Sequence, residues 1–201
     1  MSYQALVVNK SEDDFSIGVE ARDDSELPEG EVTIAVDWSD VNYKDALAST
    51  ANGRVVTKYP LVLGIDLAGT VQASSDAGFR TGDRVVAIGY DIGTGHDGGY
   101  ADLARLPAKW VAKLPDGLSS EEAMALGTAG FTAAMSVDAI QTGGVSQTKD
   151  NIAITIKSYC QVARSKVQKR ACHTTRNGSK EKPGAVALRS FASVCNSRQV
   201  K

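Results

Sequence analysis

The chain has 201 residues, of which 42% are hydrophobic and 23% are charged, and its formal net charge is −2. This composition excludes a collagen, a coiled coil, a disordered acidic tail and a disulfide-stabilised mini-protein. The length fits one large domain or two small ones, with enough apolar residues for a sizeable core. No apolar run approaches the ~20 residues that cross a bilayer, and the first ten residues show no secretory pattern, so a soluble cytoplasmic protein is predicted.

The near-neutral total hides a sharp change in charge after Thr155. Residues 1–155 carry 11 Lys and Arg against 23 Asp and Glu, a net charge of −12. Residues 156–201 carry 11 Lys and Arg against the single acidic residue Glu181, a net charge of +10. Because one globular domain seldom changes composition so abruptly, the last 46 residues are interpreted as a separate segment.

Short strands separated by turn residues are predicted over most of the acidic part. Residues 32–38 alternate apolar and polar side chains, which is typical of a half-buried strand. The apolar segment Leu61–Val71 is interrupted by Gly64 and Gly69, which indicates a bent strand or a close backbone approach. The other predicted strands are 3–8, 15–20, 84–88, 100–105 and 110–113. Many short strands of this kind predict a mainly β domain, either a barrel or a sandwich.

Helices are predicted where this pattern ends. Ser119 and Glu122 have the spacing of a capping box that opens a helix, and 128–140 is a second helical stretch. Gln141–Gly144 ends that stretch, and Asn151–Thr155 then has the composition of a buried strand. A β domain followed by helices and a parallel-type strand is the order in which a nucleotide-binding domain begins.

Two patterns that suggest binding sites are interpreted as incidental. Gly93–Gly98 satisfies the dinucleotide-binding pattern G-x-G-x-x-G, and Asp116 follows at the sequence distance of a ribose contact. The pattern requires a helix directly after it, but Pro107 follows too soon for one, so a glycine-rich hairpin loop is predicted. The three cysteines lack the pair spacing of a metal site and are interpreted as free thiols. His96, among glycines and carboxylates, is predicted to be a solvent-exposed loop histidine.

Four segments together resemble one family, and they fall in order along the chain. They are Asp40–Leu47, Tyr59–Val71, Asp97–Tyr100 and Gly127–Ala133. They are similar to the zinc-independent quinone oxidoreductase branch of the medium-chain dehydrogenases, above all its acrylyl-CoA reductase (YhdH/YhfP-like) group. The resemblance covers residues 1–155. It implies a GroES-like β-barrel domain over 1–125 and the start of a Rossmann domain over 126–155, which here is truncated.

The resemblance also implies a reaction and the residues that support it. Family members transfer hydride from NADPH to an activated C=C, as in an unsaturated acyl-CoA, or to a quinone. Asn42 and Tyr43 are the predicted catalytic residues, which could form hydrogen bonds with the nicotinamide ribose or with a substrate carbonyl. Asn42, Ala46 and Thr128 are the predicted cofactor-binding residues. Zinc-dependent relatives carry a Cys near the position of Asn42 and Gly-His-Glu in place of Gly64–Asp66, so no metal is predicted.

Purely structural roles remain open for the same residues. Asn42 has the side chain of an ordinary N-cap for a short helix at 43–48, Tyr43 fits a core, and Thr128 fits the cap of the helix after it.

The segment 156–201 departs from the resemblance. Family members continue after the strand with a glycine-rich turn that contacts the pyrophosphate, whereas here no glycine follows Thr155 until Gly178. A short helix over 156–170 and an irregular basic remainder are predicted. Because dimers of the family form through the Rossmann domain, the resemblance leaves the oligomeric state open.

The alternative function is a non-enzymatic β-barrel module whose basic tail binds RNA or an acidic protein. The tail has the necessary charge but only two aromatic residues, Tyr159 and Phe191, and no known RNA-binding module, so nucleic-acid binding is disfavoured. An enzyme with a small-molecule substrate and no membrane contact is the preferred interpretation.

Overall fold

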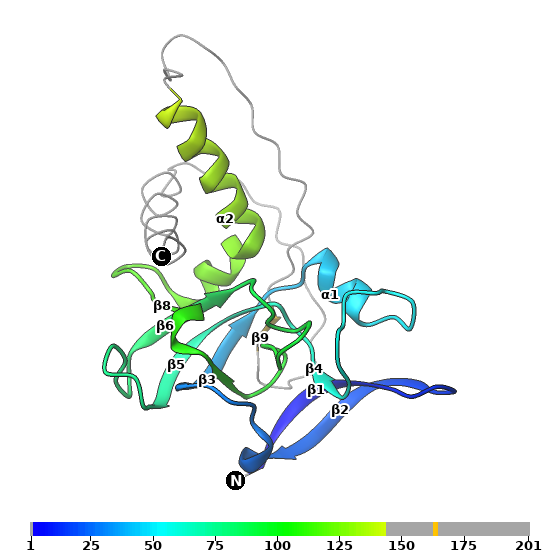
Figure 1. The fold of residues 1–201 in the computed structure, drawn as a ribbon. Coiled ribbons are helices and arrows are strands. Elements are labelled where there is room, and N and C mark those ends of the chain that lie inside the picture. Colours follow the sequence, from blue (N-terminus) through cyan, green and yellow to red (C-terminus); the bar gives the residue numbers. More distant parts are fainter. Residues whose placement is uncertain (1, 144–162, 165–201) are drawn as a thin grey trace.

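The computed structural model describes residues 2–143 and 163–164, which form two antiparallel sheets and two α-helices (Figure 1). The first sheet has the strand order β2-β1-β4. Its strands are β1 (Ser2–Lys10), β2 (Phe15–Asp23) and β4 (Leu61–Val62). β1 and β2 form a long hairpin that pairs over the full length of both strands.

The second sheet has six strands, with β7-β3-β5-β6-β8 as its main path. These strands are β3 (Val32–Ser39), β5 (Asp66–Ser74), β6 (Arg84–Ile88), β7 (Leu103–Leu106) and β8 (Val111–Lys113). The sixth strand, β9 (Ala163–Arg164), pairs with the end of β3 at Trp38 and Ser39. β7 occupies the same edge of β3 further back, from Val32 to Ala35.

The main core lies on the second sheet and consists of β-branched and leucine side chains. Their alternation along β3 puts every second side chain into this core, as the sequence predicts. The side chains that are completely buried there are Val32, Ile34, Leu67, Val85, Ile92, Leu106 and Val111. Two short 3-10 helices, Asp24–Glu26 and Ala108–Trp110, connect the strands at the edges of this core.

The two helices differ in length and setting. α1 (Tyr43–Ala48) follows β3 directly, and α2 (Ser120–Thr142) follows β8 and extends away from the sheets (Figure 1). The predicted capping box is confirmed, because the Ser119 hydroxyl accepts from the Glu122 N–H at 3.1 Å while the Glu122 carboxylate accepts from the Ser119 N–H at 2.9 Å. The two predicted helical stretches are confirmed: α2 consists of two helical segments that meet in a kink at Gly127, whose φ of +48° and ψ of −160° are not helical.

The prediction of a single bent strand over Leu61–Val71 is wrong. This segment forms β4 and β5, which belong to different sheets. Gly64, between them, has φ +98°, a conformation that side chains disfavour, and a Cβ there would meet the ring of Tyr100 at 2.6 Å. Gly69 is the predicted close approach, because a Cβ there would overlap the carbonyl oxygen of Ala35 on β3.

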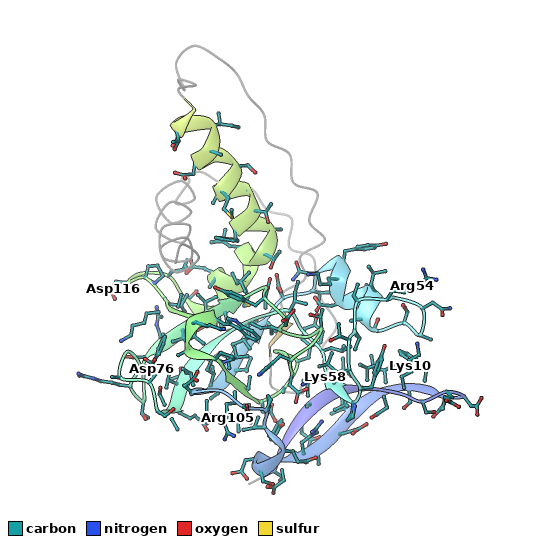
Figure 2. All side chains as sticks on the ribbon, viewed as in Figure 1. Lys10, Arg54, Lys58, Asp76, Arg105 and Asp116 are labelled. Carbon is teal, nitrogen blue, oxygen red and sulfur yellow. The ribbon has the colours of Figure 1, made fainter. Side chains whose placement is uncertain are left out.

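The loop predicted around Gly93–Gly98 is present, but it is not a hairpin. Its one bridge, Ile92 to His96, is parallel, and no helix opens after it. His96 is half-buried rather than solvent-exposed: its ring lies 3.1 Å from the carbonyl oxygen of Glu29 and packs edge-on against Trp110. Asp116 lies in the turn between β8 and α2, at the periphery of the molecule (Figure 2).

Several predictions concern residues that lie outside the described ranges. These are the strand at 151–155, the three cysteines and nearly all of the segment 156–201. The predicted helix over 156–170 is wrong at Ala163 and Arg164, which form β9.

Candidate functional site

Asn42 lies in the turn between β3 and α1, where the backbone is extended before the helix begins. Its φ and ψ are −105° and 160°, as expected for the residue that caps a helix. The backbone N–H of Asn42 donates to Asp45 Oδ2 at 2.7 Å, which fixes the start of α1. The side-chain amide donates to Asp40 Oδ1 at 2.8 Å and to Asp66 Oδ2 at 3.1 Å. Asn42 is therefore the N-cap of α1, and its amide nitrogen bonds to two carboxylates.

Asp66, the first residue of β5, accepts the second of these bonds and has no exposed surface. Its carboxylate accepts four hydrogen bonds from three parts of the chain. Besides Asn42, the donors are the Gly89 N–H to Oδ1 at 3.2 Å, and both the N–H and the hydroxyl of Thr128 at 2.7 Å. A buried carboxylate needs such partners, since removing it from water without them is costly.

The kink at Gly127 makes the contact with Thr128 possible. In an unbroken helix the N–H of Thr128 would donate to the preceding turn, whereas after the kink it is free to donate to Asp66 Oδ2. A side chain at residue 127 would overlap the Asp40 carboxylate and lie 3.3 Å from Asp66 Oδ2. Glycine is thus required here both for its conformation and for space.

Asp45 links the turn before α1 to the residue that precedes Asp66. Its Oδ2 accepts from the Asn42 N–H, and its Oδ1 accepts from the Ile65 N–H at 2.9 Å. The hydroxyl of Tyr100 donates to the carbonyl oxygen of Asp40 at 2.9 Å, so a further loop is tied to the same turn. Asp40, Asp45 and Asp66 are all buried.

Burial dominates the titration of these groups. Desolvation raises the pKa of Asp66 and that of Asp45 above the usual range of a carboxyl, although the hydrogen bonds they accept act in the opposite direction. Desolvation also raises the pKa of Tyr100, so its hydroxyl stays protonated and remains a donor. The labelled side chains of Arg54, Asp76 and Asp116 lie at the periphery of the molecule in Figure 2, in contrast to the three buried carboxyl groups.

The structure brings two of the four predicted site residues together. Asn42 and Thr128 share Asp66 as their acceptor. Tyr43 and Ala46 lie on α1 and are exposed, Tyr43 at 79%. The structural alternative for Tyr43, a core residue, is therefore wrong.

The three buried carboxyl groups are not among the site residues that the sequence predicts. A signal for Asp66 was present, since it interrupts an apolar run between Leu63 and Ala68, where an acidic residue needs a specific partner. Asp40 and Asp45 flank Asn42 within one short segment, but their burial cannot be inferred from its composition.

Within residues 2–143 and 163–164, no group of three or more His, Cys, Asp or Glu side chains is arranged to hold a metal ion. At the position where zinc-dependent relatives carry a ligand, Asn42 directs its amide nitrogen at two carboxylates, and a neutral amide nitrogen is not a metal ligand. The prediction that no metal is bound stays a prediction.

α2 is long and apolar enough, by length and composition alone, to cross a membrane. An 18-residue window within it has a mean hydropathy of 1.3, and 22% of that window is buried. Its kink and the bonds from Thr128 to Asp66 attach it to the second sheet, so we interpret it as a helix of this domain.

Comparison with known proteins finds similarity over part of the chain. Residues 28–116 match the alcohol dehydrogenase GroES-like domain. A Bacillus subtilis protein named as a quinone oxidoreductase, YhfP, is 46% identical over 153 residues, which are 76% of this chain and 46% of that protein. The acrylyl-CoA reductase AcuI of Ruegeria pomeroyi is 44% identical over 155 residues, 76% of this chain and 47% of that protein.

Solved structures give the same result. The YhdH oxidoreductase of Salmonella enterica, in complex with NADP, has a TM-score of 0.69 at 43% identity over 72% of this chain and 45% of its own. The Bacillus subtilis YhfP structure, with NAD bound, has a TM-score of 0.71 at 46% identity over 74% of this chain and 45% of its own. The chain spans about half the length of the relatives that it matches.

Proposed function

We propose that this chain, which matches the alcohol dehydrogenase GroES-like domain over residues 28–116, is the substrate-side half of an NADPH-dependent oxidoreductase. Its similarity to YhfP and AcuI supports a place in the zinc-independent quinone oxidoreductase branch of the medium-chain dehydrogenases. The acceptor is an activated C=C, as in an unsaturated acyl-CoA, or a quinone. When bound, NADPH supplies the hydride, and the protein supplies position and polarity.

The observation that carries this proposal is the cluster of Asn42, Asp66 and Thr128. Asn42 is half-buried beside α1 and is held by two carboxylates, which is the preorganisation that a ligand contact requires. Its Oδ1 is suited to a ribose hydroxyl of the nicotinamide half of NADPH. Thr128 opens the second half of α2 next to it, and its hydroxyl oxygen still has capacity to accept a bond.

Tyr43 and Ala46 complete the proposed site from α1. The exposed ring of Tyr43 is available to a substrate, and the small side chain of Ala46 lets a cofactor approach the helix surface closely. We assign Asn42 and Tyr43 to the substrate and reacting centre, and Asn42, Ala46 and Thr128 to the cofactor.

The division of the chain into 1–125, 126–155 and 156–201 is part of the proposal. The first boundary falls within α2, two residues before the kink at Gly127, so the helix joins the GroES-like domain to the start of the nucleotide-binding part. Because that part lacks the family's glycine-rich turn, we expect weak NADPH binding and low activity.

A cytoplasmic location and a small-molecule partner are likewise proposed.

Fluorescence titration of the chain with NADPH tests the proposal. We expect saturable binding that Asn42→Leu weakens roughly tenfold, the usual effect of losing one hydrogen bond. Asn9→Leu is the matched control, because Asn9 also donates to a carboxylate, Glu20 at 2.8 Å, but on the exposed β1–β2 hairpin.

The acceptor is identified by measuring NADPH oxidation with acrylyl-CoA and with a benzoquinone in parallel. Retention of RNA by the same preparation, measured against salt concentration, tests the alternative function of the basic segment. The absence of NADPH binding, together with RNA retention that falls steeply with salt, would contradict the enzymatic proposal.

A further inference from the structure

The amide of Asn42 has a definite orientation, which its partners impose. A side-chain amide has two hydrogens and one acceptor oxygen. Nδ2 lies 2.8 Å from Asp40 Oδ1 and 3.1 Å from Asp66 Oδ2, so both hydrogens are donated to carboxylate oxygens. The opposite orientation would place the amide oxygen against two acceptors and lose both bonds. Oδ1 is therefore the atom of this group that remains for a ligand.

Asp66 cannot turn to release Asn42. Its Oδ2 accepts from Asn42 and from the Thr128 N–H, while its Oδ1 accepts from Gly89 and from the Thr128 hydroxyl. These donors come from the turn before α1, the end of β6 and the second half of α2. Any rotation of the carboxylate would break bonds to at least two of these segments.

Building on the proposed function, we propose that Asp66 is a positioning residue that fixes the donor side of Asn42, so that Asn42 presents only an acceptor to the bound ligand. The group that Asn42 recognises is then a hydrogen-bond donor, the ribose hydroxyl of the nicotinamide nucleotide. A substrate carbonyl, which needs a donor, is excluded as its partner. Asp66 itself touches no ligand and acts through Asn42.

Two substitutions at Asp66 separate positioning from folding. Asp66→Asn keeps an oxygen that accepts from Asn42 and from the Thr128 N–H. Its new NH₂ group donates to the Thr128 hydroxyl oxygen. Only the Gly89 N–H then loses its acceptor at residue 66. Asp66→Ala removes every acceptor. Both variants are examined by proton–nitrogen correlation spectra of the 201-residue chain, whose backbone signals report whether the fold is kept.

The first readout is solvent exchange of the Asn42 side-chain amide protons, without ligand. We expect slow exchange in the wild type and in Asp66→Asn, and an acceleration of roughly tenfold or more in a folded Asp66→Ala. If Asp66→Ala does not fold, Asp66→Asn and Asn42→Leu still test the inference: fast exchange in a folded Asp66→Asn would overturn it. Equal exchange in Asp66→Ala and the wild type would overturn it as well.

The second readout compares two probes that share a dihydronicotinamide ring. Reduced nicotinamide mononucleotide carries the ribose hydroxyls, and N-benzyl dihydronicotinamide has none. We expect Asn42→Leu to weaken the mononucleotide roughly tenfold and to leave the benzyl compound unchanged, with Asn9→Leu affecting neither.

An equal loss for both probes would overturn the assignment of Asn42 to a ribose hydroxyl. Failure of both probes to bind the wild type would refute the proposed function and this ligand assignment together. The exchange measurement, which uses no ligand, would still decide whether Asp66 positions Asn42.

Discussion

The two halves of α2 have similar apolar composition but very different surroundings. Before the kink, Ser120, Ala123 and Met124 are buried against the second sheet. After it, among the residues that the structure describes, Ala134 is the buried one, while Met135 and Val137 are each 40% exposed. Figure 1 shows this second half extending away from the strands. Hydropathy therefore does not decide burial here: the change of direction at Gly127 does.

The difference shows how the second half is held. The first half is stabilised by apolar packing, which is broad and non-directional. The second half is attached by the bonds from Thr128 to Asp66 and by Phe131, which packs against the same core as the first half. Its exposed apolar side chains, Met135 and Val137, are available to a partner such as the nucleotide-binding part proposed above.

Gly127→Ala should have the largest effect, because it affects the junction itself. The new Cβ would overlap the Asp40 carboxylate and occupy a positive-φ conformation, for a combined cost of about 4 kcal/mol in the free energy of unfolding. Gly117→Ala is the control, since φ there is +83° but a Cβ meets nothing within 4 Å, so about 1 kcal/mol is expected. Urea denaturation measures both; equal losses would show that the junction is not crowded.

Met124→Ala and Met135→Ala compare the two halves directly with one residue type. Met124 has no exposed surface, so its truncation should leave a cavity and cost about 3 kcal/mol. Met135 is 40% exposed, and its truncation should cost under about 0.5 kcal/mol. A similar loss at both positions in urea denaturation would mean that the second half is packed as firmly as the first.

Ser119→Ala removes the cap of the first half and should cost about 1 kcal/mol, because the Glu122 N–H loses its acceptor. In the second half, Ser136 bonds back to the carbonyl oxygen of Thr132 at 2.9 Å, a bond that adds little to helix stability. Ser136→Ala should therefore change the unfolding free energy by under about 0.5 kcal/mol. Thermal unfolding followed by circular dichroism checks the pair, and a larger loss at Ser136 would contradict this assignment.

Two carboxyl groups that bond to the beginnings of the two halves of α2 should respond to pH in opposite directions. They are Glu122, in the first turn of the helix, and Asp66, which accepts from Thr128 just after the kink. Hydrogen bonds from Ser119 lower the pKa of Glu122, so its contribution to stability exists above the unfolded pKa of about 4.3 and is lost as pH falls. Burial raises the pKa of Asp66, so its contribution is complete below the unfolded pKa of about 3.9 and is lost as pH rises through the raised value.

Unfolding free energies of Glu122→Gln and Asp66→Asn, each compared with the wild type over a series of pH values, test these signs. The difference for Glu122→Gln should grow from acid toward neutral pH, and that for Asp66→Asn should shrink. Parallel trends for the two variants would show that burial does not control the titration of Asp66.

Local sequence patterns predicted the elements well where a local cause forms them. The alternation along β3 and the capping box at Ser119 each act within a few residues, and both elements are present as expected. The short strand predicted at 84–88 is also present, as β6. The single strand predicted over Leu61–Val71 failed because Gly64 changes the chain direction by a positive φ, which the apolar pattern around it does not encode.

The candidate site depended on contacts that no local pattern records. The resemblance selected Asn42 and Thr128, but the carboxylate that joins them, Asp66, is 24 and 62 positions away from them. Asp66 is buried because the start of β5 lies between the turn before α1 and the kink in α2, both of which donate hydrogen bonds to it. Such a cluster becomes visible only when the tertiary arrangement is known.

The pairing of β9 with β3 makes the last part of the chain relevant to the order of assembly. Ala163 and Arg164 complete the edge of β3 at Trp38 and Ser39, directly before Asp40. During synthesis, most of the two sheets emerges from the ribosome before these two residues do, so this edge closes late and through a contact of high sequence separation. A chain stalled before residue 163 would leave the backbone groups of that edge open to pairing with another nascent chain.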